Sequence, residues 1–331
     1  MNTIPLHLLP NTESLLVLRN MEIRDQLAYS LCSKNTKKSI KSLNLKAQYI
    51  NITVFDSVRA GIHLKNLILS WSSMKLNNVF LSSQVMVHEG IYFTSKETND
   101  WKWDLENYEF KDLLHHFCEV FHHPKIDYFS IDGENLDDNC IEPIQSVIKG
   151  IQIGRLEIND ELTNDFAEKA LDSFPNYEKL GLLQIPFRMD KQNKLLIQNL
   201  KSVCIPGADE IKINQVLLSN SEIIQLYISN FNEKELNTFM KLWIRGSNPR
   251  LKYFYTMGQP LFGNEFLDKT AVLRGIKYVQ VPLDSQEVYL LNAYENYFFE
   301  RKLAGGFRIW RFDGTTAVIV VTESEFEFIV E

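Results

Sequence analysis

The stretch "IQLYISNFNEKELNTFMKLWIRGSNPRLKYFY", residues 224–255, predicts a strand, a helix and a second strand. Asn232 is suited to cap the start of the helix, and Glu235, three residues later, completes a capping box. An apolar stripe at helical spacing follows, formed by Leu236, Phe239, Met240 and Trp243. We therefore expect this helix to pack on the strands, with Trp243 in the core.

Short apolar strands of this kind recur from residue 128 onward. They begin at residues 128, 155, 179, 201, 224, 251 and 277, so successive starts are 22 to 27 residues apart, and helix-like segments occupy most of the intervals. A strand and a helix repeated at this period are typical of a leucine-rich-repeat-like solenoid, whose strands stack into one parallel sheet. The sequence therefore predicts an array of strand/helix units.

Other elements precede and follow this array. Residues 4–45 predict three short helices, and residues 48–94 predict an antiparallel meander, because β-rich runs are separated there by Ser/Asn clusters. An amphipathic helix is predicted at residues 108–121. Near the end, Asp313 and Gly314 separate two apolar runs, which is a strong hairpin signal. We expect an α/β fold: a three-helix module, a β-rich meander, the solenoid and a C-terminal β-hairpin cap.

The predicted elements fall into two domains, residues 1–46 and residues 47–331. The second would contain a β-rich entry segment with its helix (47–125), the repeat-like units (126–285) and the C-terminal β cap (286–331). A chain of 331 residues is long for one compact core, which agrees with two modules or an elongated array.

The composition argues against several classes of protein. A net charge of −7 and a pI near 5.6 disfavour general nucleic-acid binding. No apolar run approaches the ~20 residues that a membrane-spanning helix needs, and the N-terminal stretch lacks the basic region of a signal peptide. The cysteines are widely spaced and form no CxxC pair, which fits free thiols in a reducing compartment. We therefore expect a cytoplasmic and/or nuclear protein.

Four lysines recur at helical spacing near the N-terminus: Lys34, Lys37, Lys38 and Lys41. They could form an arm for nucleic acid, a membrane-surface helix, or the outer face of a small module that docks on another protein. No aromatic residues interleave them, as a groove for single-stranded nucleic acid requires. No large apolar face backs them, as membrane anchoring requires. The protein-docking module is favoured, with no nucleic-acid or membrane partner.

The segment "HHFCEVFHH", residues 115–123, invites a metal-binding interpretation. On a helix, His115, Cys118 and His122 would lie within roughly 60° of one another, because each residue advances about 100°. A structural zinc site needs four ligands, however, and no other Cys/His cluster supplies the rest. Cys118 also borders the apolar stripe, so we expect a core position for it, with no metal and no cofactor.

Catalysis has little support in the sequence. The stretch "DGENLDD", residues 132–138, resembles a calcium loop in composition only, because the spacing of its acidic residues is not that of an EF-hand. No phosphate-binding loop, nucleophile elbow or zinc-protease motif occurs. We therefore expect a protein that is not an enzyme, with an enzyme on a repeat scaffold as an alternative.

The segment "LHLLPNTESLLVLRNMEIRDQLAYSLCSKNTKKSIKSL", residues 6–43, resembles an F-box. The leucine and proline of that motif fall at Leu9 and Pro10. The serine and lysine that open its last helix fall at Ser33 and Lys34. The resemblance implies that this module binds a Skp-type adaptor.

Most of the remaining chain resembles the type-2 F-box-associated domain of the large nematode F-box families. The matching pieces are "FKDLLHHFCEVF" (110–121), "FNEKELNTFMKLWIRGSNPRLKYF" (231–254), and the ending "GGFRIWRFDGTTAVIVV" (305–321) with "FEFIV" (326–330). The resemblance implies a substrate-recognition subunit of a cullin-based ubiquitin ligase, whose C-terminal domain binds an unknown target protein. A protein that binds the adaptor without serving a ligase is the alternative.

The F-box resemblance and the apolar pattern predict which residues face the adaptor or form the core of the module. They are Leu9, Pro10, Val17, Leu18, Ile23 and Leu27. Such an apolar stripe is too large to leave exposed on a small module.

Two tyrosines are candidates for target binding. Residues alternate between the two faces of a strand, so Tyr227 and Tyr278 would project from the open face of the parallel sheet while Val279 and Val281 point inward. Tyrosine is enriched at interface hot spots. A solvated sheet face, or one covered by the meander, is the alternative.

Overall fold

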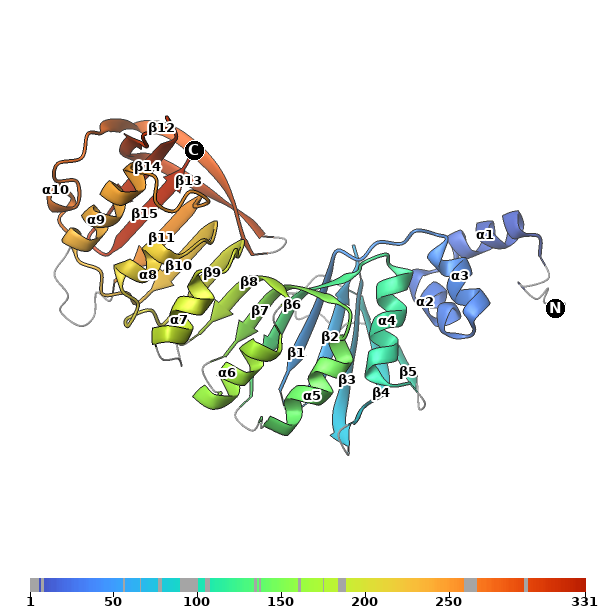
Figure 1. Ribbon diagram of the computed structural model, residues 1–331. Helices are drawn as coiled ribbons and strands as arrows, with labels where there is room; N and C mark the ends of the chain where they lie inside the picture. The colour runs from blue at the N-terminus through green and yellow to red at the C-terminus, as the bar shows by residue number, and fades with distance from the viewer. Residues whose placement is uncertain are drawn as a thin grey trace. The chain divides into compact units, whose positions relative to one another are not determined.

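Figure 1 shows the computed structural model, in which the chain divides into two units. One comprises residues 1–127 and 137–152, and the other comprises residues 128–136 and 153–331. N-terminal helices are followed by a strand-rich, mixed α/β part, as the sequence predicts. The structure describes residues 6, 9–55, 57–65, 67–76, 79–89, 101–104, 108–133, 136, 138–159, 162–174, 176–183, 189–258, 267–294 and 297–331.

The first unit opens with three short helices, called here the helical module: α1 (Asn11–Asn20), α2 (Ile23–Leu31) and α3 (Lys34–Lys41). A capping box starts α3, because Ser33 Oγ accepts from the Thr36 N–H while the Ser33 N–H donates to Thr36 Oγ1 at 2.8 Å. The module has a small apolar core, and a core of this size needs further cover. The fully buried core residues are Leu18, Leu27 and Ile40.

An antiparallel meander follows, in which each strand lies beside the one before it in the chain. Its strands are β1 (Tyr49–Val54), β2 (Ser57–His63), β3 (Leu67–Leu76), β4 (Val79–Glu89) and β5 (Trp101–Asp104). Alternate residues of β1 are buried, as expected for a sheet packed on one face. The predicted meander is confirmed over β1 to β4; residues 90–94 lie outside the described residues.

Helix α4 (Phe110–Val120) packs its apolar face on this meander. The ring of Trp71, on β3, lies with its centroid 5.6 Å from those of both Phe110 and Phe117. The predicted apolar stripe of this helix is fully buried: Phe110, Leu113, Leu114, Phe117 and Phe121. A 3-10 turn (Asp138–Cys140) and α5 (Ile141–Ile148) also belong to the first unit.

In the second unit, strands β7 to β11 run parallel, each beside the next, and β6 lies beside β7. Their bounds are β6 (Lys125–Ile131), β7 (Gln152–Ile158), β8 (Tyr177–Leu182), β9 (Ser202–Ile205), β10 (Ile223–Tyr227) and β11 (Tyr253–Met257). Between them come α6 (Asn164–Ser173), α7 (Met189–Leu196), α8 (Ile213–Leu218) and α9 (Glu233–Ile244), on one face of the sheet in Figure 1. The alternation of strands and helices in the sequence therefore corresponds to alternating elements in the fold.

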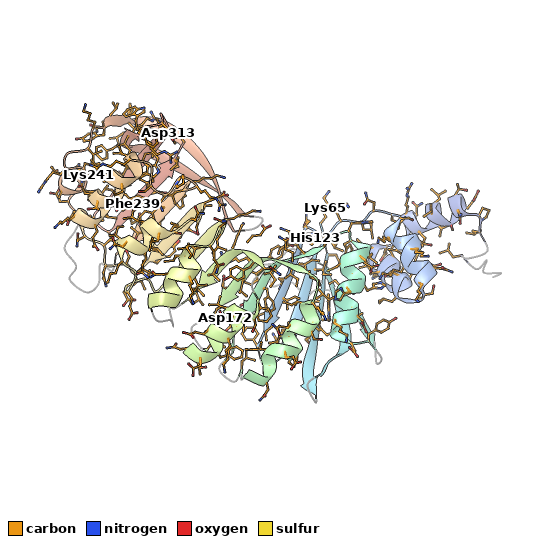
Figure 2. The ribbon with its side chains drawn as sticks, in the orientation of Figure 1. Lys65, His123, Asp172, Phe239, Lys241 and Asp313 are labelled. Carbon is orange, nitrogen blue, oxygen red and sulfur yellow. The ribbon has the colours of Figure 1, made fainter. Side chains whose placement is uncertain are left out.

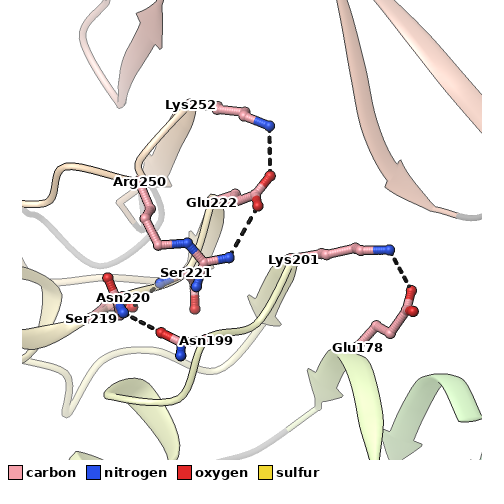
Figure 3. A network of polar contacts seen from close by, with 9 residues as sticks. All are labelled: Glu178, Asn199, Lys201, Ser219, Asn220, Ser221, Glu222, Arg250 and Lys252. Atoms are coloured by element: carbon pink, nitrogen blue, oxygen red, sulfur yellow. Dashed lines mark hydrogen bonds and ion pairs between the residues drawn. The ribbon is translucent and has the colours of Figure 1, made fainter.

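An alternating row of charges runs across the starts of these parallel strands (Figure 3). Glu178, Lys201, Glu222 and Lys252 occupy equivalent positions, each beside the next across the strand register. Lys201 donates to Glu178 at 2.7 Å, and Lys252 donates to Glu222 at 2.7 Å. The hydrogen bond from Lys252 lowers the pKa of Glu222. Each exposed pair contributes at most ~1 kcal/mol to the free energy of unfolding. The row therefore favours this register of the strands but adds little to the stability of the fold.

The last four strands continue the sheet through antiparallel pairings. They are β12 (Val279–Tyr294), β13 (Tyr297–Trp310), β14 (Thr316–Val321) and β15 (Glu325–Val330), in the order β12-β13-β14-β15-β11. The hairpin predicted at Asp313 and Gly314 is confirmed by the pairing of β13 with β14. The last strand, β15, pairs antiparallel with β11.

The strand predicted at residue 277 is not the next parallel strand. β12 pairs antiparallel with β13 and is separated from β11 by three strands, so the prediction of one parallel sheet reaching Val281 is wrong. β15 lies beside β11 instead, and its Phe326 and Phe328 pack against Phe239 of α9. The predicted orientation of Val279 is also wrong, since this side chain is 58% exposed while Val281 is buried.

An aromatic cluster fixes α9 to the sheet. Phe239 lies 5.0 Å from Phe254 on β11 and 5.3 Å from Phe328 on β15, and Trp243 lies 5.0 Å from Phe328, all measured between ring centroids. All four side chains are fully buried, which confirms the predicted core position of Trp243. The edge-to-face geometry adds to the stabilisation from area burial. This cluster therefore joins the parallel strands to the C-terminal hairpins.

We expect Trp243→Ala to destabilise the second unit strongly, because truncating a fully buried aromatic residue costs ~3–5 kcal/mol. Denaturant-induced unfolding should show this loss. Trp310→Ala is the matched control: that tryptophan is 43% exposed, so its loss should change the free energy of unfolding by ~0.5 kcal/mol or less. Equal midpoints for Trp243→Ala and the parent chain would contradict this packing.

Candidate functional site

Helix α1 carries an exposed apolar surface. Leu16 is 63% exposed and Val17 is 43% exposed, whereas Leu18 is buried. Pro10, which precedes the first turn, is also exposed. Exposed aliphatic side chains on a small module mark a surface that a partner can cover.

The six residues predicted for the helical module separate into two groups. Leu18 and Leu27 form its core, so they shape the module from within. Leu9 and Ile23 are half-buried, and Pro10 and Val17 are exposed. Contact of these residues with an adaptor stays a prediction.

Leu16 was not among the predicted site residues, although it is the most exposed leucine of the helical module. Three leucines and a valine follow one another closely in this helix, and their order alone does not show which of them faces the core. Only the packing of α1 on α2 decides this. Gln26 helps to fix that packing, because its buried Nε2 donates to the carbonyl of Leu18 at 2.7 Å.

The opposite side of the helical module docks on α4. Lys37 Nζ lies 2.9 Å from Glu119 Oε2, and Ser30 Oγ lies 2.9 Å from His116 Nε2. The hydrogen bond from Lys37 lowers the pKa of Glu119. These contacts join α2 and α3 to the face of α4 that turns away from the meander.

Two contacts between side chains and backbone carbonyls reinforce this docking. The Tyr108 hydroxyl donates to the carbonyl of Leu31 at 3.0 Å, at the end of α2. His122 Nε2 lies 3.0 Å from the carbonyl oxygen of Lys41, at the end of α3. Hydrogen bonds of this kind satisfy carbonyls that a helix end leaves without an intrahelical partner. The helical module is therefore held at several points along α4.

The four lysines at helical spacing near the N-terminus are thus divided between two environments. Lys34 and Lys38 are exposed, but Lys37 and Lys41 are half-buried. The prediction that Lys37 points outward is wrong, because Glu119 of α4 attracts it. Two of the four lysines therefore belong to the docked side of the helical module.

The histidines and the cysteine of α4 lie in different environments. His115 is exposed and Cys118 is buried, and burial raises the pKa of the Cys118 thiol to about 12. Among the residues that the structure describes, no group of three or more His, Cys, Asp or Glu side chains could hold a metal ion. The segment instead serves packing, with His116 in contact with the helical module.

The two tyrosines predicted for target binding lie on separate parts of the sheet. Tyr227, at the end of β10, is half-buried, with its ring 5.3 Å from that of Tyr255. Tyr278, just before β12, is 46% exposed, and its ring packs edge-to-face with that of Phe307, with 5.1 Å between the centroids. Four strands separate β10 from β12, so the two tyrosines do not form one ladder. A role of either tyrosine in target binding stays a prediction.

Comparison with known proteins matches both parts of the chain. Residues 6–48 match the F-box domain family, and residues 191–256 match the family described as F-box associated. The chain contains an F-box and an F-box-associated domain. The helical module is the F-box, and the second match spans α7 to β11 with the aromatic helix α9.

A curated relative carries the same family description. The "F-box associated domain-containing protein sdz-33" of Caenorhabditis elegans is 30% identical over 110 residues. That similarity covers 33% of this chain and 34% of the relative, so it spans about a third of each protein. No solved structure shows a significant match. The described helices include none that is both long and apolar enough to span a membrane.

We expect the docked F-box to make stability depend on pH through His116. Burial, followed by the charge of Lys37, lowers the pKa of His116 from 6.5 to about 4. Between these values the unfolded chain binds a proton that the folded chain does not, so the free energy of unfolding falls as pH decreases through this window. In His116→Gln this contribution is absent, and unfolding midpoints should depend less on pH.

The control is His115→Gln on the exposed side of the same helix. Because the substitution removes a histidine that does not contact the F-box, this variant should keep the pH dependence of the parent chain. Identical pH dependence in His116→Gln and the parent would contradict the docking described here.

Proposed function

We propose that this protein is a non-catalytic substrate-recognition adaptor of a cullin-based ubiquitin ligase. Its F-box binds a Skp-type adaptor, and its F-box-associated part binds a target protein. One observation carries this proposal: α1 exposes Leu16 and Val17 on a module whose opposite side is covered by α4. The module therefore has an apolar surface left for a partner.

The proposed activity is proximity. An adaptor that holds a target close to a charged ubiquitin carrier raises their effective concentration, so it needs no catalytic residue and no cofactor of its own. We place the protein in the cytoplasm or the nucleus for this role. An enzyme on a repeat scaffold would instead need a cluster of reactive side chains in a pocket.

The target would bind the repeat-like part of the second unit. We infer that the parallel strands β7 to β11 with their helices form a leucine-rich-repeat-like array, supported by their shared register and by the charge row at their starts. Surfaces of such arrays serve as binding sites. Tyr227 and Tyr278 are separate candidates for target contact.

We expect Leu16→Asp combined with Val17→Asp to abolish capture of a purified Skp-type adaptor by the full chain. Both side chains are exposed, so the substitutions should leave the fold intact while placing charge in an apolar interface. Leu218→Asp is the matched control, because this leucine is 55% exposed on α8 of the second unit. It should not affect capture.

Undiminished capture by the double variant, with a thermal melt equal to that of the parent, would exclude α1 as the adaptor surface. Capture of the adaptor without a cullin, under conditions where a known F-box protein captures both, would favour an adaptor-binding protein that serves no ligase.

A further inference from the structure

The C-terminal end of α9 gathers basic side chains from two segments. Lys241 lies in the last turn of α9 and Arg245 directly follows the helix, while Arg274 and Lys277 lie in the loop between α10 (Lys269–Val272) and β12. All four are exposed, and none has an ion-pair partner among the described residues. Their charges are therefore available to a ligand.

The loop is fixed to the helix, which keeps the four charges together. Asn237 Nδ2, on α9, donates to the carbonyls of Val272 (2.6 Å) and Arg274 (3.0 Å). At Gly275, an added Cβ would lie 3.7 Å from Lys241 Nζ, so the lysine lies directly against the loop. In Figure 2, Lys241 on α9 and Asp313 in the β13–β14 hairpin lie at the same end of the second unit.

One exposed aromatic ring lies beside the end of α9, and a second follows Lys277 in the chain. Phe312, in the β13–β14 turn, is 76% exposed, and Tyr278 directly follows Lys277. The Phe312 N–H donates to the carbonyl of Ile244 at 3.0 Å. Its ring lies over Gly246, where an added Cβ would come within 2.7 Å of the ring and where φ is +104°. The ring is therefore held in place beside the end of α9.

Two acidic groups of the neighbouring segments, Asp313 and Glu331, are already paired. Asp313 accepts from Arg311 Nε at 2.9 Å and from the Thr315 N–H at 3.0 Å, and the hydrogen bond from Arg311 lowers the pKa of Asp313. Glu331 accepts from Arg308 at 2.8 Å. These acids therefore do not neutralise the basic residues at the end of α9.

The helix dipole accounts for only part of this arrangement. Basic side chains near a helix C-terminus interact favourably with the dipole, which explains Lys241 and Arg245. It does not explain Arg274 and Lys277, which belong to another segment, or the exposed ring of Phe312. Unpaired bases beside fixed, exposed aromatic rings are suited to a ligand that is both acidic and apolar.

We propose that this surface, formed by Lys241, Arg245, Arg274, Lys277, Tyr278 and Phe312, binds an acidic segment of the target protein that carries one large apolar side chain. This inference rests on the proposed function. The basic residues attract the carboxylates, and the apolar side chain packs on the rings. A protein segment is favoured over a nucleic acid because the patch is small and the chain is acidic overall, which repels a long polyanion.

The test uses the full chain and fluorescence anisotropy with a labelled peptide pool. In each peptide a leucine, phenylalanine or tryptophan is flanked on both sides by aspartates and glutamates. One comparison pool has serine in the apolar position, and another has lysine in the acidic positions. We expect both comparison pools to bind at least about tenfold more weakly than the acidic-apolar pool.

Variants of the protein separate the two parts of the surface. Arg274→Glu with Lys277→Glu should weaken binding of the acidic-apolar pool about tenfold or more, and Phe312→Ser should remove the preference over the serine pool. Lys65→Glu is the control, because Lys65 is an exposed lysine of the first unit. It should bind as the parent does.

Three results would overturn the proposal: equal binding of the apolar and serine pools, unchanged binding by the charge-reversed variant, or tighter binding of a single-stranded oligonucleotide of matched charge. Adaptor capture is measured with the same proteins and should be unchanged in every variant. If the parent chain captures no adaptor, the proposed ligase function fails, and the peptide result is judged by itself.

Discussion

The docking of the helical module on α4 is the constraint on which the proposed role of the F-box depends. Three helices whose buried hydrophobic residues are Leu18, Leu27 and Ile40 leave much of their surface in need of cover. Helix α4 covers one side through the pairs Lys37–Glu119 and Ser30–His116. The exposed residues of α1 lie on the part of the module that α4 leaves uncovered. Leu16 and Val17 are therefore accessible while α4 stays docked.

The second unit depends in the same way on α9. Its buried face collects rings from strands β11 and β15, which are neighbours in the sheet although they lie far apart in the sequence. Beside its exposed C-terminal end lie bases from the loop between α10 and β12 and a ring from the β13–β14 turn. One helix therefore both holds the sheet together and presents the proposed binding surface.

Local sequence signals predicted the elements well. The capping box of Asn232 and Glu235 forms at 3.0 and 3.1 Å, and the apolar face of α4 is buried as its spacing indicates. Features that depend on residues far away in the sequence could not be predicted. The direction of Lys37 depends on Glu119, and the place of β12 depends on β15 competing for the edge of β11. For the same reason the sequence did not single out Leu16, or the grouping of Arg274 and Lys277 with Lys241.

Hydrogen exchange of the full chain, with and without a purified Skp-type adaptor, tests most directly whether the F-box uses one side for α4 and the other for its partner. We expect the adaptor to slow exchange of the backbone amides of α1, while exchange in α3 and α4 stays as it is in the free chain. Slowed exchange in α4, or accelerated exchange in both α3 and α4, would show that the adaptor acts on the docked side and would contradict this assignment.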